Sequence, residues 1–272
     1  MSPEDPHPPA PSPDLGGQDG EEDDAPSGPL FPPSEGKGRS AERGQAIAIA
    51  ATVTLAGALA ARVGLDPDRG GQPVVLGAFG LAYGALAIAA VVRLRRRGEA
   101  FLLRPASGDI SLGAASAALL YALAMASRLA IAPQGTPREA WIVRLYLQLG
   151  ESEALHLLER PEASGPMLGV AVLLVAAAEE LAWRGLVLRS LESAFGTRRA
   201  VAISLALYVI ANAPSAMLLR DPTAGPNPLL VIAALGGGLV WTGLYLRRGR
   251  LLPAVFSHAL FTWAMVEFPL WH

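Results

Sequence analysis

Residues 165–185 read Gly-Pro-Met-Leu-Gly-Val-Ala-Val-Leu-Leu-Val-Ala-Ala-Ala-Glu-Glu-Leu-Ala-Trp-Arg-Gly, and this stretch decides the fold that we expect. Its apolar part is continuous rather than alternating, which predicts a helix rather than a half-buried strand. With the apolar residues that follow it, the run is long enough to cross a hydrocarbon core of about 30 Å. We therefore predict a membrane-spanning helix over residues 166–188.

Further apolar runs on both sides have a similar length. Only helices and closed barrels satisfy their backbone hydrogen bonds in lipid, and continuous runs favour helices. The predicted fold is an all-α, polytopic transmembrane bundle of about seven spans. Small residues such as Gly77, Gly80 and Gly84 suit close approach between such helices. The six additional spans are expected at residues 45–61, 74–92, 110–132, 200–219, 229–246 and 252–268.

The first 43 residues have a different composition from the rest of the chain. They are acidic, Pro-rich and nearly devoid of large apolar side chains, so they are expected to form a disordered tail. We find no signal peptide before the first apolar run. The predicted organisation is a tail over 1–43, N-terminal spans with an external segment over 44–165, and a core over 166–272. The chain contains no cysteine, which excludes disulfides and a thiol nucleophile.

Arginines concentrate in the second, fourth and sixth connections between the predicted spans, and seven spans would place all three connections on one side. The positive-inside rule then predicts a multi-pass protein of the inner membrane with a cytoplasmic N-terminus. Residues 133–165 become the largest external connection. Within it, apolar side chains recur at helical spacing, which fits either an interfacial helix or a simple covering loop. These side chains are Trp141, Ile142, Leu145, Tyr146 and Leu149.

The adjacent carboxylates Glu179 and Glu180 are expected about 20 Å along the fourth span, inside the bilayer. Ionisable groups at that depth are costly and usually face a bundle interior, which favours a functional site. Glu180 lies four residues before Arg184, an order that favours an ion pair. Glu179 is rotated about 100° away and stays free to act as a general base on water. A charge cluster that reaches toward the cytoplasmic headgroups is the alternative.

The fifth and seventh spans carry the other polar residues. His258 and Thr262 are four apart in the seventh span, hence on one helix face, at a depth where they could meet Glu179. A histidine in an apolar helix is often only a packing residue, so this interpretation stays open. Tyr208 and Asn212 repeat the spacing in the fifth span, where an interhelical hydrogen bond is an equally good explanation for Asn212.

Together these motifs resemble the CPBP family of intramembrane proteases, which includes type II CAAX prenyl endopeptidases and bacterial abortive-infection proteins. The resemblance covers residues 166–266 and rests on Glu179-Glu180-x-x-x-Arg184, on an aromatic residue four before a polar one, and on Leu-Pro-Ala-x-x-x-His258. It implies that Glu179 activates water, that Glu180 and Arg184 support it, and that His258 stabilises the oxyanion.

Two positions depart from the family pattern. Asn212 stands where the family usually has histidine, and Thr262 stands where it has asparagine. Asn212 can hold a water but cannot take up a proton, and the Thr262 hydroxyl reaches less far than an amide. One histidine with these carboxylates falls short of the three protein ligands that a catalytic zinc site usually has. We therefore expect no metal and no cofactor.

The sequence thus predicts an intramembrane endopeptidase that hydrolyses a peptide bond near the membrane-anchored end of a protein substrate. Its expected partners are that membrane-associated substrate and the lipid bilayer, with no nucleic acid. The alternative is a catalytically inactive scaffold or immunity protein with the same fold. A transporter is disfavoured because the sequence shows no inverted repeat or broken helix pair.

Overall fold

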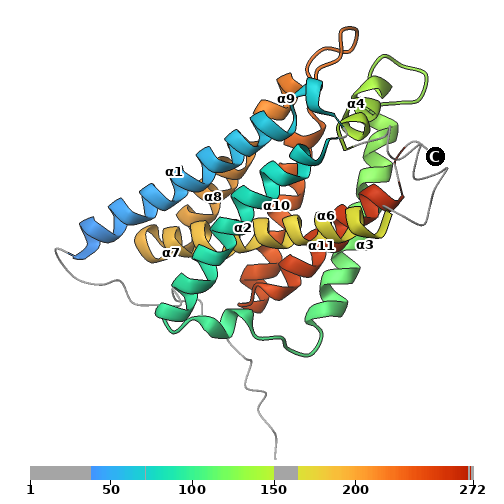
Figure 1. The fold of residues 1–272 in the computed structure, drawn as a ribbon. Helices are drawn as coiled ribbons and strands as arrows, with labels where there is room; N and C mark the ends of the chain where they lie inside the picture. The colour runs from blue at the N-terminus through green and yellow to red at the C-terminus, as the bar shows by residue number, and fades with distance from the viewer. Residues whose placement is uncertain (1–37, 71, 150–164, 269, 271–272) are drawn as a thin grey trace, which may run out of the picture. The chain divides into compact units, whose positions relative to one another are not determined.

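The computed structural model describes residues 38–70, 72–149, 165–268 and 270, and every regular element in these ranges is helical (Figure 1). Two short 3₁₀ turns, η1 (Pro67–Arg69) and η2 (Ala100–Leu103), lie in connections. The remaining elements are α1 (Gly38–Gly64), α2 (Pro73–Arg96), α3 (Asp109–Ile131), α4 (Glu139–Leu149), α6 (Gly165–Glu180), η3 (Leu181–Leu188), α7 (Arg189–Phe195), α8 (Thr197–Asn212), α9 (Pro214–Leu218), α10 (Leu229–Arg248) and α11 (Leu252–Glu267).

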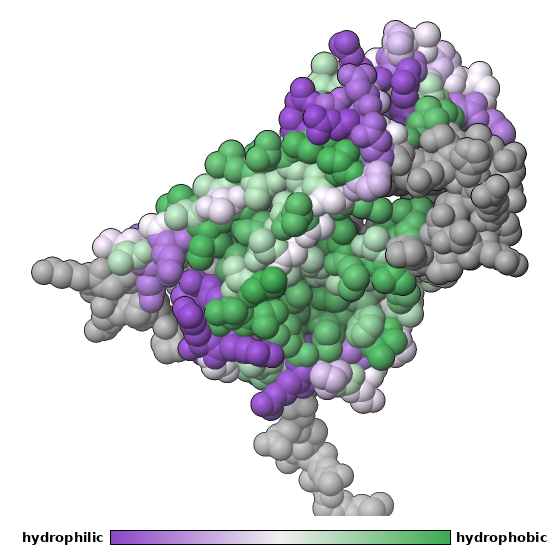
Figure 2. All heavy atoms as spheres, viewed as in Figure 1, coloured by the Kyte–Doolittle hydropathy of each residue, from purple (hydrophilic) through white to green (hydrophobic). Residues whose placement is uncertain are grey.

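Five stretches of the described chain are long and apolar enough to cross a membrane, which confirms the polytopic helical prediction. They are α1 from Ser40, α2, α3, α8 together with α9, and α10. Large apolar side chains remain exposed along them, among them Leu55, Leu81 and Leu129. Figure 2 shows these surfaces as a broad hydrophobic band with hydrophilic side chains gathered beyond it at both ends. Such a band suits lipid, where apolar side chains need no protein cover.

The other two predicted spans differ from the five. Helices α6 and α11 have 16 residues each, or about 24 Å at 1.5 Å per residue, which is less than a hydrocarbon core. However, α6 continues through η3 into α7, so that the chain stays helical from Gly165 to Phe195. Helix α11 packs along both α3 and α6, whereas α2 packs against α6 and η3. The core therefore forms around the helix that the opening stretch of sequence predicts.

The first helix begins several residues before the predicted end of the tail at residue 43. Helix α1 begins at Gly38, so residues 38–43 are helical, while residues 1–37 lie outside the described residues.

The predicted close contacts at Gly77 and Gly84 are wrong, because nothing lies within 4 Å of a Cβ built at either position. A close approach between helices occurs instead at Gly113, where a Cβ would stand 2.7 Å from the Cβ of Phe256. This glycine lets α3 approach α11 closely.

The three arginine-rich connections lie at one end of the helices, as the sequence predicted. Arg189, on the helix that leads to the fourth connection, donates to Glu99 in the second connection. Arg250, in the sixth connection, donates to the carbonyl of Arg104 in the second. The backbone amide of Leu251 also donates to the carbonyl of Leu102. We call this the basic end of the molecule.

Helix α4 caps the opposite end, and it is a helix rather than a covering loop. Its apolar side chains Ile142 and Tyr146 are buried in a cluster with Ala132 and Leu270, so this face packs on protein rather than on a bilayer surface. Gln148 donates to the carbonyls of Gly64 and Asp66 and ties α4 to the end of α1. Residues 150–164 of the predicted external segment lie outside the described residues.

Candidate active site

The two carboxylates of the opening stretch are the last residues of α6, and the helix changes its geometry directly after them. Residues 181–188 form a π-helical segment, in which backbone bonds reach one residue further than in an α-helix. Such segments are rare and often accompany functional sites. The Glu180 side chain is completely buried and the Glu179 side chain is 15% exposed, so neither points openly toward lipid.

Glu180 and Arg184 form the ion pair that their spacing predicted. Arg184 Nη1 donates to Glu180 Oε1 at 2.8 Å, and both side chains are buried. Arg184 Nη2 donates to the carbonyl of Gly238 on α10 at 3.0 Å. A Cβ at Gly238 would stand 2.8 Å from the Leu205 side chain and 3.1 Å from the Tyr208 ring, so glycine suits the close packing of α10 on α8. The guanidinium therefore links α6 to α10 while neutralising one buried carboxylate.

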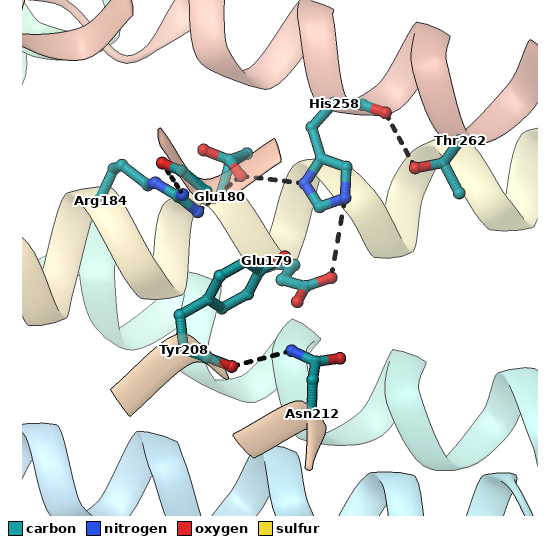
Figure 3. Close-up of polar contacts among 8 residues, drawn as sticks. Glu179, Glu180, Arg184, Tyr208, Asn212, His258 and Thr262 are labelled. Atoms are coloured by element: carbon teal, nitrogen blue, oxygen red, sulfur yellow. Dashed lines mark hydrogen bonds and ion pairs between the residues drawn. The ribbon is translucent and has the colours of Figure 1, made fainter. Parts of the chain in front are cut away.

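His258 connects the two carboxylates. Its Nδ1 lies 2.9 Å from Glu180 Oε1, and its Nε2 lies 4.0 Å from Glu179 Oε2 (Figure 3). Because a carboxylate only accepts hydrogen bonds, the short contact assigns a proton to Nδ1. The imidazole also stacks on the ring of Trp241, with centroids 3.7 Å apart and planes 18° apart. The carboxylate and the indole together fix the ring so that Nε2 faces Glu179.

Glu179 is held more loosely than Glu180. No arginine in the described part of the chain forms an ion pair with it, and Figure 3 shows its carboxylate extending from α6 into the space between His258 and the residues of α8. The phenol groups of Tyr83 and Tyr208 lie beside it and interact with it. The side chain thus combines partial exposure with neighbouring hydroxyl and imidazole donors, which is the arrangement that a base acting on water requires.

Asn212 and Thr262 lie near this cluster but use their donors within their own helices. Asn212 Nδ2 donates to the carbonyl of Tyr208 at 3.0 Å, and Thr262 Oγ1 donates to the carbonyl of His258 at 2.9 Å (Figure 3). Each bond spans four residues, a common arrangement for a polar side chain inside a helix. The structure therefore gathers Glu179, Glu180, Arg184 and His258, whereas among the described residues Asn212 and Thr262 form no hydrogen bond with either carboxylate.

Sequence reasoning missed three residues that shape the site. Trp241 and Gly238 come from α10, a span that carried no candidate, and Tyr83 comes from α2. Gly236, Gly237 and Gly238 precede Trp241 in the sequence, and this glycine run is the one signal that could have pointed to close packing there. Nothing in the local pattern around Tyr83 distinguishes it from an ordinary aromatic residue of a membrane helix.

The donor set does not suit a metal ion. No group of three or more His, Asp or Glu side chains in the described ranges is arranged to hold one. His258 Nδ1 already faces Glu180, and Glu180 Oε1 is shared with Arg184. A catalytic zinc ion would need about three protein ligands around an open position. We therefore derive no step through a metal.

Comparison with known proteins supports the resemblance that the motifs indicated. Residues 161–264 match the family model described as type II CAAX prenyl endopeptidase Rce1-like. This range contains Glu179, Glu180, Arg184 and His258. No curated protein and no solved structure gives a significant match to the chain.

Proposed function

We propose that the Rce1-like type II CAAX prenyl endopeptidase domain at residues 161–264 is an active intramembrane endopeptidase. It hydrolyses a peptide bond near the membrane-anchored end of a protein substrate. The observation that supports this most directly is the position of His258, with Nδ1 2.9 Å from Glu180 and Nε2 4.0 Å from Glu179. One carboxylate is thereby fixed and the other is left for chemistry.

In the proposed reaction, Glu179 accepts a proton from a water molecule that lies between its carboxylate and His258 Nε2. The resulting hydroxide attacks the carbonyl carbon of the scissile bond, and the carbonyl oxygen becomes an oxyanion. When the C–N bond breaks, the leaving amine takes the proton from Glu179. The products are a carboxylic acid, which then releases its proton to water, and a free amine, and Glu179 returns to its starting carboxylate.

His258 stabilises the oxyanion in this proposal. A protonated imidazole donates from Nδ1 to Glu180 and from Nε2 to the developing negative charge. Stacking on Trp241 holds the ring in this orientation. Glu180 and Trp241 act as positioning residues, and Arg184 offsets the cost of burying Glu180.

Tyr83 and Tyr208 supply further hydrogen-bond donors beside Glu179. This matters because the donors of Asn212 and Thr262 are bonded to backbone carbonyls of their own helices. Loss of one oxyanion donor typically lowers a rate by about 100- to 1000-fold. We infer that the two phenols offset part of that loss.

Asn212 and Thr262 favour the competing function, a catalytically inactive scaffold or immunity protein. Asn212 cannot take up a proton, and Thr262 is turned toward the carbonyl of His258 rather than toward Glu179. An inactive protein would keep the buried Glu180–Arg184 pair for stability. It would not need Glu179 as an ionisable group.

The deciding experiment compares the C-termini of membrane proteins in cells that express the wild type, Glu179→Gln or Glu267→Gln. Glu267 is an exposed residue at the end of α11 and serves as the matched control. Loss of a general base typically costs about 100- to 10,000-fold. We expect Glu179→Gln to abolish the processing of specific C-termini at unchanged expression, and Glu267→Gln to preserve it. Identical termini in all three strains would support the scaffold instead.

The variant Asn212→His provides a second test that distinguishes an active protease from an inactive scaffold. An active enzyme that lacks a proton acceptor on α8 should cleave faster when imidazole is introduced beside Glu179, and its rate should then fall again on Glu179→Gln. A scaffold would show no cleavage with either variant. Purified protein and a peptide substrate taken from the first experiment suffice for this measurement.

We also infer that the basic end faces the cytoplasm of a bacterial inner membrane, as the positive-inside rule indicates. Because the chain has no cysteine, single-cysteine variants report orientation without background. Arg198→Cys at the basic end should be shielded from a membrane-impermeant thiol reagent in intact cells. Thr223→Cys, in the loop between α9 and α10, should react. The reverse pattern would place the N-terminus outside.

A further inference from the structure

Helices α1 and α2 enclose a groove at the basic end of the molecule. They meet near their connection and spread apart toward the beginning of α1 and the end of α2 (Figure 1). The groove between them has a volume of about 750 Å³, in the range of small-molecule sites. Its floor contains Val53 and Leu186, both buried.

The walls of the groove are apolar and follow helical spacing. Ala48, Ile49 and Thr52 line it from α1, and Leu86 and Ala89 line it from α2. Residues three or four apart share one face of a helix, so each set forms a continuous stripe along the groove. Small side chains in both stripes leave room between the helices. The result is a long apolar channel within the surface that would face acyl chains.

The polar end of the groove is strongly basic. Arg93, Arg96 and Arg97 line it there, together with Gln45. In the described ranges, the one side-chain hydrogen bond of these arginines joins Arg93 Nη2 to the neutral Gln45 Oε1 at 3.4 Å. No carboxylate in the described ranges forms an ion pair with any of the three. Glu99, the nearest candidate along the chain, is bonded to Arg189 at 2.9 Å.

We propose that this groove binds an anionic phospholipid, with an acyl chain between α1 and α2 and the phosphate on Arg93, Arg96 and Arg97. Guanidinium groups recognise phosphate well, and basic pockets between membrane helices on the cytoplasmic side suit lipid headgroups. Figure 2 shows hydrophilic side chains gathered next to a hydrophobic surface at this end, the pattern that an amphiphile matches. This proposal does not depend on the proposed protease activity.

Two other occupants fit less well. Free phosphate would satisfy the arginines but would leave the apolar channel unfilled. The acidic N-terminal segment matches the arginines in charge, since Glu21, Glu22, Asp23 and Asp24 form a negative run. It contains few large apolar side chains, so it offers little to fill the space between Ile49 and Leu86.

The test measures lipid retention by native mass spectrometry of the full-length protein from nanodiscs of phosphatidylglycerol and phosphatidylcholine in equal parts. We expect phosphatidylglycerol to be retained preferentially. One arginine beside an anionic headgroup contributes roughly fivefold in affinity. The triple variant Arg93→Gln, Arg96→Gln and Arg97→Gln should therefore lose on the order of 100-fold in this preference. The matched triple variant Arg198→Gln, Arg199→Gln and Arg247→Gln removes three exposed charges at the same end and should retain it.

A second variant tests the channel without changing charge. Ala48→Phe with Ala89→Phe fills the groove and should reduce retention although all three arginines remain. Unchanged retention in this variant, or displacement of the lipid by millimolar inorganic phosphate, would show that the headgroup alone binds and would overturn the proposal. Equal retention of both lipids by the wild type would also overturn the proposal. A further outcome would assign the groove to the acidic N-terminal segment: a preference for phosphatidylglycerol that appears only when that segment is neutralised by Glu21→Gln, Glu22→Gln, Asp23→Asn and Asp24→Asn.

Discussion

Two polar clusters on the same long helix use similar residues in different ways. In the first, Arg184 bonds Glu180 while Glu179 keeps only the 4.0 Å contact with His258 as an ion pair. In the second, which we call the α7 cluster, Arg189 bonds both Glu99 and Glu192, at 2.9 and 3.4 Å. Tyr245 also donates to Glu192 at 3.0 Å.

The difference lies in how the carboxylates are paired. In the α7 cluster the single arginine bonds both carboxylates and so joins α7 to the connection after α2, while Tyr245 adds α10. In the candidate site the arginine serves one carboxylate and the other faces an imidazole and two phenols. We infer that burial and charge alone do not mark a catalytic site. We propose that Glu179, which is held near donors but bonded to no arginine among the described residues, is the carboxylate available for chemistry.

The largest expected effect on stability comes from Arg184→Met. It leaves Glu180 buried with only His258 as a cationic partner, and breaking such a buried pair typically costs about 3–5 kcal/mol. Thermal unfolding of the full-length protein in detergent measures this loss. The double variant Glu180→Gln with Arg184→Met should recover part of it, because no unpaired buried charge remains. A loss below about 1 kcal/mol in the single variant would contradict the comparison.

Arg189→Met should have a smaller effect. Its partner Glu99 is 15% exposed and can recover hydration, and its other partner Glu192 keeps the hydrogen bond from Tyr245. We therefore expect a loss of about 1–3 kcal/mol, the typical range for hydrogen bonds to charged groups. Cleavage per folded molecule should remain at the wild-type level, which a peptide assay corrected for folded protein would show. A selective loss of turnover would mean that the α7 cluster takes part in the reaction.

Tyr245→Phe and Tyr208→Phe form a matched pair that sharpens the comparison further. Removing the Tyr245 hydroxyl deletes one hydrogen bond to Glu192 and should cost about 1 kcal/mol in unfolding free energy without changing turnover. Removing the Tyr208 hydroxyl should have a similar effect on stability but should also lower the cleavage rate. Equal rates in the two variants would argue against a role for Tyr208 as a donor beside Glu179.

The smallest expected effect belongs to Asp221, a loop carboxylate outside both clusters. A hydrogen bond from the Thr223 hydroxyl, helped by the backbone amides of Thr223 and Ala224, lowers the pKa of Asp221 from 3.8 to about 2. Since the folded pKa is depressed, the stabilisation is complete above pH 3.8 and is lost as the pH falls toward 2. Asp221→Asn should remove this small pH dependence from the unfolding temperature, whereas Asp68→Asn in the α1–α2 connection should retain it.

Several features could be predicted from the sequence because they depend on neighbours along one helix. Hydrophobic runs predicted the helices, since lipid leaves the backbone few alternatives. The Glu180–Arg184 pair follows from a spacing of four residues, and so does the placement of His258 and Thr262 on one face. Arginine placement predicted which connections share one end. Each of these inferences needs only local geometry.

The contacts that define the site could not be predicted in this way. Whether His258 meets Glu180, Glu179 or neither depends on how α11 is rotated against α6, and the π-helical segment after Glu180 changes the register of the residues that follow. Stacking of Trp241 on His258 also depends on how α10 packs against α11. Helix α4 likewise has an amphipathic pattern that suits either lipid or protein, and the fold placed protein there.

The sequence by itself therefore determined the helical membrane architecture, the ends of the helices that carry positive charge, and the local partner of Glu180. Only the tertiary structure decided that His258 lies between the two carboxylates and that Glu179 is left without an arginine. The physical reason is that periodicity fixes which residues share a helix face. The rotation, crossing and close approach of separate helices arise from packing among residues far apart in the chain.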